Sequence, residues 1–196
     1  MAALALTRQG ETCLATAVEV AARPQKPAFA TAIARDALAS ETADRALPVA
    51  RGWRTSRSWL KRRAAWEVLA RHATAADKPW VEARLVTLGR SGAKGVDETY
   101  ALAEIVSARF AGHEFPMLGR RFDTFPYSYG RHYLAEALAV TDPTFPTTRA
   151  FTALWDCEAD TRVVAAEHVS LSVPARSNAC VNSPLTRSRT TTASSR

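Results

Sequence analysis

One five-residue pattern recurs along this chain of 196 residues, and it constrains the fold more than any other feature of the sequence. Each copy places a small residue beside aliphatic ones, within a segment that has the apolar periodicity of a helix. The four clear copies occupy 64–68, 102–106, 134–138 and 165–169, and a weaker one occupies 34–38. The second residues of the clear copies are 38, 32 and 31 residues apart, and the weaker copy lies 30 residues before the first. Periods of this length are typical of repeat architectures.

Between successive copies the sequence predicts another short helix, so the repeating unit is a helical hairpin. One hairpin cannot bury its apolar stripe alone, but stacked hairpins share a continuous core. The composition agrees with an all-α fold, because the chain has 39 Ala and only two Ile. The expected helices are at about 11–22, 27–39, 57–72, 78–90, 98–111, 114–122, 128–140, 146–156 and 160–171. Segment 44–56 contains Pro48 and Gly52 and shows no defined element.

Six residues are expected to maintain the repeat. Alanine lets two helices approach closely where they cross, and the second residues of the copies are Ala65, Ala103, Ala135 and Ala166. A second landmark is an aromatic residue followed by Asp: Phe122-Asp123 precedes Arg131, and Trp155-Asp156 precedes Arg162. We expect Asp156 to cap the helix that follows it and Arg162 to bond to a neighbouring turn.

The last copy resembles the HEAT-repeat pattern, in which a first helix and a turn with Asp lead into a second helix with an early Arg and an Ala pair. It runs from Leu154-Trp155-Asp156 through Arg162, Ala165, Ala166 and Val169. The resemblance covers about residues 27–171 and implies a short α-solenoid of stacked hairpins, with an irregular Ala-rich bundle as the alternative. Two features depart from the pattern: the copy at 59–72 has no clear partner helix with an Asp turn, and Gly130 lies inside the third copy.

Three regions follow from this interpretation. Residues 1–26 form an N-terminal helix and linker, residues 27–171 form the HEAT-like repeats, and residues 172–196 form a basic tail rich in Ser and Thr. The tail has too few apolar residues to offset the entropy cost of ordering it, so we expect it to be disordered. It carries four Arg and no acid, so more than half of the net charge of +7 lies in the tail.

A basic run is the strongest local feature. Between Arg45 and Arg63 there are seven basic residues and no acid, with Trp53 and Trp59 among them. Basic groups bind phosphates and aromatic faces stack on bases, so the run is a candidate nucleic-acid contact. Its members for that role are Arg54, Arg57, Lys61, Arg62 and Arg63. The alternative is a solvated helix face whose tryptophans pack in the core or against arginine stems.

Two enzyme families share this type of fold. Leu154-Trp155-Asp156 is similar to a segment of the DNA alkylation repair glycosylases, whose Asp beside aromatic residues could stabilise a cationic sugar or base. The deoxyhypusine hydroxylases bind iron through several His-Glu pairs, whereas this chain has only His113-Glu114 and has Tyr133 where a second ligand would be. The three cysteines are widely spaced and fit neither a disulfide framework nor a zinc site. We therefore expect no catalytic residues, no cofactor and no metal.

The sequence thus favours a non-catalytic, cytoplasmic protein-interaction scaffold with a protein partner. The alternative is a nucleic-acid-binding helical-repeat module that resembles the alkylation repair glycosylases. No run reaches 18 apolar residues, so we expect no membrane span. The location of the basic run discriminates between the two functions. Exposed arginines beside tryptophan on a concave surface would favour nucleic-acid binding, whereas a convex or buried location would favour the scaffold.

Overall fold

The computed structural model describes residues 11–23, 29–89 and 95–170, and all regular secondary structure in these ranges is helical. The α-helices are α2 (Glu11–Ala22), α3 (Phe29–Ala39), α4 (Ala43–Trp53), α5 (Trp59–His72), α6 (Lys78–Gly89), α7 (Val96–Arg109), α8 (Pro116–Thr124), α9 (Arg131–Thr141), α10 (Arg149–Ala153) and α11 (Ala159–His168). Short 3-10 helices are η1 (Ala75–Asp77), η2 (Ser128–Gly130) and η3 (Phe145–Thr147). The expected disordered tail, 172–196, lies outside the described residues.

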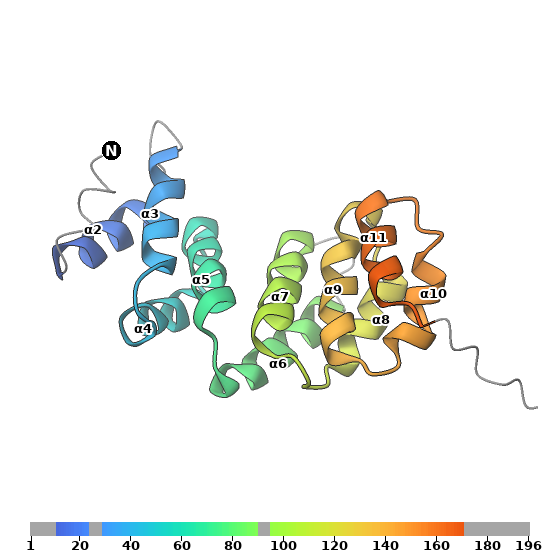
Figure 1. Ribbon diagram of the computed structural model, residues 1–196. Coiled ribbons are helices and arrows are strands. Elements are labelled where there is room, and N and C mark those ends of the chain that lie inside the picture. Colours follow the sequence, from blue (N-terminus) through green and yellow to red (C-terminus); the bar gives the residue numbers. More distant parts are fainter. Residues whose placement is uncertain (1–10, 24–28, 90–94, 171–196) are drawn as a thin grey trace, which may run out of the picture.

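The helices form two rows (Figure 1). In one row, α3, α5, α7, α9 and α11 follow one another, and each packs against the next. In the other row, α4, α6, α8 and α10 pack respectively on α5, α7, α9 and α11. The helix α2 packs against both α3 and α5. The all-α prediction is therefore confirmed for the described residues, and the core is the layer between the two rows.

Alanines lie in this core where helices of the first row meet, because a methyl group permits close approach. Ala65, Ala103 and Ala135 are completely buried on α5, α7 and α9. On α11 the buried alanine is Ala165, whereas Ala166 is exposed. The sequence pattern placed the packed alanine of the last copy one residue too late, and no described helix covers the outer side of α11, where Ala166 lies.

Two arginines fix this register by bonding back to the turn before their helix. Arg162 donates from Nη1 to the carbonyl oxygens of Asp156 and Cys157, at 2.8 and 3.0 Å. Arg62 makes the equivalent pair of bonds to Ser56 and Arg57, at 2.7 and 3.1 Å. The expected Arg-to-turn bond is therefore present in two hairpins, and in each the packed alanine follows the arginine by three residues.

Asp156 does not cap α11 as expected, because the N-cap residue is Glu158 and no side chain caps the helix; Asp156 instead stabilises the turn before it. Asp156 is buried and accepts a hydrogen bond from the backbone N–H of Glu158 at 3.0 Å. Ser56 accepts the same bond from Ser58 N–H, at 3.2 Å, in the turn before α5. The hairpin of α4 and α5 therefore has its partner helix and its polar turn, with serine in the place of aspartate. The pattern of an aromatic-Asp pair followed by Arg is less regular in the structure than in the sequence. Arg131 is the first residue of α9, and its guanidinium pairs with Asp156 before α11.

Ion pairs connect one hairpin to the next. Arg51 on α4 donates from Nε and Nη2 to the two carboxylate oxygens of Asp77, at 2.9 and 2.8 Å. Asp77 is almost fully buried and also accepts a bond from the backbone N–H of Thr74. Burial raises the pKa of Asp77, but the donors from Arg51 and Thr74 outweigh it, so the pKa lies below its ordinary value. The carboxylate is therefore charged where α5 leads into α6.

Segment 44–56 differs from the sequence-based expectation, because α4 occupies most of it. Pro48 lies inside this helix, exposed to solvent, although proline lacks the backbone N–H of a helix interior. The opposite side of α4 buries Ala46, Leu47 and Ala50 against the core. Burial of that apolar stripe outweighs the hydrogen bond that proline cannot make. The expected helix at 146–156 is shorter and is divided into η3 and α10.

Candidate functional site

The first row of helices presents a pocket of about 280 Å³ where α7 lies between α5 and α9. We call it the α7 pocket. It is lined by Arg63, Trp66, Glu67, Asp97, Tyr100, Ala101, Glu104 and Tyr133. Half of these residues come from α7 itself, so the regular geometry of one helix sets much of the spacing in the site.

Two tyrosines form the aromatic part of the α7 pocket. The rings of Tyr100 on α7 and Tyr133 on α9 lie 5.4 Å apart between centroids, and Phe125 packs on Tyr100 at 5.6 Å. Gly130 allows this arrangement, because a Cβ at that position would lie 1.8 Å from Cε1 of Tyr100. The glycine that departs from the repeat pattern therefore makes room for a pocket residue.

Two carboxylates of the α7 pocket have no counterion among the residues that the structure describes. Asp97 and Glu104 are seven residues apart on α7, on the same side as Tyr100, so they lie about 10 Å apart along the helix. Both are exposed, and within the described part of the chain no hydrogen bond or ion pair reaches either carboxylate. A charged group without a partner beside aromatic rings is available to a ligand of opposite charge.

The α5 side of the α7 pocket is more nearly neutral. The carboxylate of Glu67 pairs with Arg63 at 3.2 Å and with Arg35 of α3 at 3.3 Å. Next to them Trp66 is 2% exposed, and its indole N–H has no hydrogen-bond acceptor among the described residues. The uncompensated negative charge of the pocket is therefore concentrated on α7.

The pKa values of both tyrosine hydroxyls in the pocket are raised, mainly by burial. Burial raises the pKa of Tyr100, and Asp97 raises it further. Burial likewise raises the pKa of Tyr133, with Glu104 and Glu136 adding to the effect. The neutral hydroxyl is therefore the favoured form of both tyrosines, chiefly because burial disfavours the phenolate.

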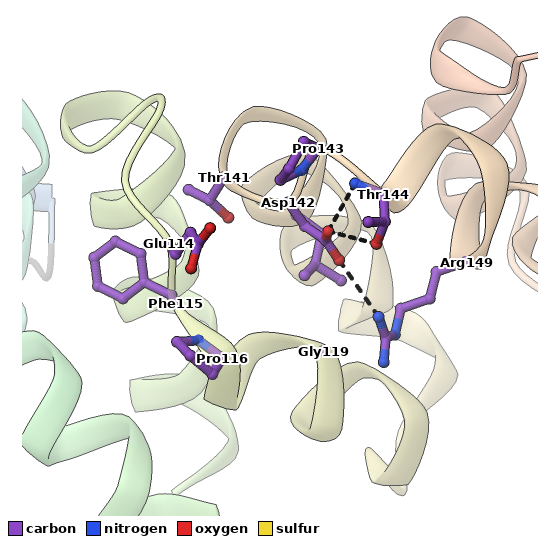
Figure 2. Close-up of a pocket in the computed structure, with 10 residues that line it drawn as sticks. Glu114, Phe115, Pro116, Gly119, Thr141, Asp142, Pro143, Thr144 and Arg149 are labelled. Carbon is purple, nitrogen blue, oxygen red and sulfur yellow. Dashed lines mark hydrogen bonds and ion pairs between the residues drawn. The ribbon is translucent and has the colours of Figure 1, made fainter.

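A second cavity, of about 320 Å³, lies between α8, the end of α9 and the start of α10 (Figure 2). Its polar groups bond to one another. Arg149 extends toward Asp142 and donates to it at 3.4 Å, and it also donates to Asp123 at 2.9 and 3.0 Å. Asp142 in turn accepts two bonds from Thr144, drawn as dashed lines in Figure 2. These groups join α8, the end of α9 and α10, so the cavity is best explained as a junction between packed helices.

The five residues predicted to contact nucleic acid are not all free to bind a ligand. Arg54 caps the end of α4, pairs with Asp77 at 3.3 Å and lies over the ring of Trp80 at 4.8 Å. Arg62 bonds to the backbone of the preceding turn, as described above, and its guanidinium lies over Trp59 at 5.9 Å. These two arginines are engaged in holding the hairpins together.

Among the other three residues, Arg57 and Arg63 are exposed and Lys61 is partly buried. Arg57 is exposed in the turn between α4 and α5. The ammonium of Lys61 lies over Trp53 at 5.5 Å. Arg63 faces the α7 pocket beside Glu67. Only part of the run is thus available as a positive surface, and its tryptophans pack against basic side chains.

The triplet that resembles the alkylation repair glycosylases is divided by the fold. Trp155 is 72% exposed and stacks on the exposed ring of Phe151 at 5.3 Å. Asp156 is buried and paired with Arg131 at 2.5 Å. An aspartate that is neutralised and enclosed in this way cannot approach a cationic sugar, so its environment suits the structural role.

The described residues contain no group of three or more His, Cys, Asp or Glu side chains placed to hold a metal ion. His113 and Glu114 are both exposed in the loop before α8. Cys157 is a free, exposed thiol beside Asp156, to which it donates at 3.6 Å.

Sequence reasoning did not identify the α7 pocket. Tyr133 was considered only as a residue in the place of a metal ligand, and Tyr100, Asp97 and Glu104 were not proposed as site residues. The available signal was the spacing of 97, 100 and 104, which places all three on one side of a helix.

Among the described helices, none is long and apolar enough to span a membrane. Comparisons of the chain with protein-family models, with curated proteins and with solved structures find no match.

Proposed function

We propose that this chain is a cytoplasmic protein-interaction scaffold, a short α-solenoid of HEAT-like hairpins with no catalytic activity of its own. The partner docks on the exposed side of α5, α7 and α9, over the α7 pocket. The observation that carries this proposal is the pair of uncompensated carboxylates, Asp97 and Glu104, beside the rings of Tyr100 and Tyr133.

Charge favours a polypeptide over a nucleic acid as the occupant of this surface. Nucleic-acid binding requires cations that neutralise phosphates, and most of its affinity comes from the counterions released. The α7 pocket presents three carboxylates and one guanidinium, and that guanidinium is paired with Glu67. A phosphate backbone placed over α7 would meet Asp97 and Glu104 without a compensating cation.

The repeat geometry supports the scaffold in a second way. Equivalent bonds from Arg62 and Arg162 to their turns indicate that the same hairpin design recurs in well-separated parts of the described array. Stacked hairpins present one continuous side of their second helices, which is the surface that repeat proteins use for extended partners. Aromatic residues within such a surface are typical of the residues that dominate binding energy.

The test is affinity capture from the source cell with the intact chain, with and without nuclease. We expect partners that survive nuclease, are lost when Asp97 and Glu104 are both changed to Arg, and are retained by the control Glu114→Arg. Glu114 is an exposed carboxylate outside the α7 pocket, so it controls for general charge. Circular dichroism must show equal helix content in all three proteins. Capture that is abolished by nuclease, or that ignores the double variant, would refute the scaffold.

The nucleic-acid alternative has its own test, a titration with duplex DNA and with RNA at about 50 mM salt and at higher salt. Changing Arg54, Arg57, Lys61, Arg62 and Arg63 together to Ser removes the whole predicted contact, but it also removes structural bonds of Arg54 and Arg62. The double variant Arg57→Ser with Lys61→Ser keeps those bonds. We expect no binding at low salt. Tight binding that survives moderate salt and is weakened by the double variant would replace the scaffold with the nucleic-acid module.

A further inference from the structure

The α7 pocket has a composition that specifies its ligand more narrowly than a protein surface in general. Aromatic rings and two carboxylates that have no counterion among the described residues meet in one cavity. We propose that the α7 pocket binds arginine side chains of an extended, basic segment of the partner, an inference that rests on the proposed scaffold function.

The carboxylates select a cation. Asp97 and Glu104 have no counterion among the described residues, so a bound cation gains their attraction without displacing an existing ion pair. Burial is the main cause of the raised pKa values of Tyr100 and Tyr133, and Asp97 and Glu104 respectively add to it. An anionic or neutral segment would leave both carboxylates uncompensated.

The rings favour arginine over lysine. A guanidinium is planar and weakly hydrated, so it can stack on an aromatic face while its N–H groups donate to a carboxylate. Tyr100 is three residues after Asp97, and both residues line the pocket, so one ligand group can reach a ring and a carboxylate together. An ammonium would retain more of its water and make only the charge contact.

The size and spacing of the site suit side chains of a peptide. At about 280 Å³ the α7 pocket is slightly below the roughly 300–1,000 Å³ of sites that enclose a whole small molecule. The distance of about 10 Å between Asp97 and Glu104 along α7 corresponds to about three residues of extended chain. Two arginines three residues apart therefore match the two carboxylates.

The experiment measures fluorescence anisotropy with labelled nine-residue Gly/Ser peptides that carry two arginines three residues apart. Matched peptides carry citrulline, which is the neutral isostere of arginine, or lysine at both positions. We expect citrulline to weaken binding at least about tenfold and lysine to weaken it about three- to fivefold. Asp97→Asn and Glu104→Gln should each weaken arginine-peptide binding about three- to tenfold, whereas Glu114→Gln should leave it unchanged.

Equal binding of the citrulline peptide, or equal loss with Glu114→Gln, would overturn the inference, and tighter binding of lysine would overturn the choice of arginine. If no peptide binds but nuclease-resistant capture remains sensitive to Asp97 and Glu104, the arginine inference fails and the scaffold stands. If the peptides bind as expected but no partner is captured, the scaffold fails instead.

Discussion

Replacing Gly130 by alanine tests the architecture of the α7 pocket directly. The new Cβ would lie 1.8 Å from Cε1, 1.9 Å from Cζ and 2.3 Å from Oη of Tyr100. Carbon atoms in ordinary contact are about 3.5–4.0 Å apart, so the ring must move by about 1.5 Å or more. Phe125 and Tyr133 hold the ring from other sides, which resists such a displacement.

Two opposing effects set the expected magnitude. Alanine restricts the unfolded chain more than glycine does, which favours the folded state by about 0.5–1 kcal/mol. Overpacking costs about 1–3 kcal/mol in a core, and here three ring atoms are involved. We therefore expect Gly130→Ala to lower the free energy of unfolding by about 1–2 kcal/mol, measured by urea denaturation.

Two comparisons isolate the cause. Gly52 lies in α4, where an added Cβ would meet no atom within 4 Å beyond its chain neighbours and the backbone of its own helix, so Gly52→Ala should stabilise the protein by about 0.5–1 kcal/mol. In the Tyr100→Ala background the clash is absent, so Gly130→Ala should become neutral or slightly stabilising. A Gly130→Ala protein as stable as the wild type would refute the packing of Tyr100 against Gly130. If Gly130→Ala also weakened binding of the arginine peptide, the packing of Tyr100 against Gly130 would be shown to position the pocket residues for binding.

Two further substitutions test the repeat register and its ion pairs. Ala165→Leu should destabilise the protein by about 1–3 kcal/mol because the site is fully buried. Ala166→Leu should change the stability by no more than about 0.5 kcal/mol because Ala166 is exposed. Equal effects of the two substitutions in thermal melts would contradict the register. The pKa of Asp77 is lower in the folded protein than in the unfolded chain, so its stabilising contribution is present above the unfolded pKa, near 3.9, and is lost as pH falls through the folded pKa. Urea denaturation between about pH 5 and 2.5 should therefore show a shallower acid loss in Asp77→Asn than in the wild type, and an identical slope would count against the charged pair.

Most of the helices could be predicted from the sequence, because their signals are local. Apolar periodicity located α5, α6, α7 and α11 within a few residues of their observed bounds. The helix α4 could not be found this way, since Pro48 and Gly52 both disfavour a helix interior. Its stability depends on burying Leu47 and its alanine neighbours against other helices, which is a tertiary effect that local propensity does not contain.

The one-residue difference in the last copy has a similar origin. Ala165 and Ala166 are chemically identical, so composition cannot decide which of them faces the core. The choice is made by Arg162, whose two bonds to the preceding turn fix the rotation of α11. The equivalent distance from Arg62 to Ala65 shows that an arginine-based alignment would have found the correct register.

The α7 pocket was less accessible to sequence reasoning, because it combines residues from three helices. Gly130 was recognised only as a departure from the repeat, and its reason becomes visible once Tyr100 is placed against it. The basic run, in contrast, was obvious in the sequence, yet two of its arginines are occupied by Asp77 and by backbone carbonyl groups. A conspicuous charge pattern and an available charge are therefore different properties.

The difference between the overall charge and the locally available charge also determines how salt should affect the binding of a basic partner. The net charge is +7, so the protein as a whole repels an arginine-rich segment at long range, while Asp97 and Glu104 attract it at contact distance. Salt screens interactions beyond about 10 Å at about 0.1 M, and it affects close contacts in the pocket less. Raising the salt concentration from about 10 to about 100 mM should therefore increase the association rate of the arginine peptide in stopped-flow measurements and increase its dissociation rate only slightly. A nucleic acid would behave in the opposite way, because its association is accelerated by the same net charge and slows as that charge is screened. An association rate that falls with salt for the arginine peptide would show that local negative charge controls the approach as well as the contact.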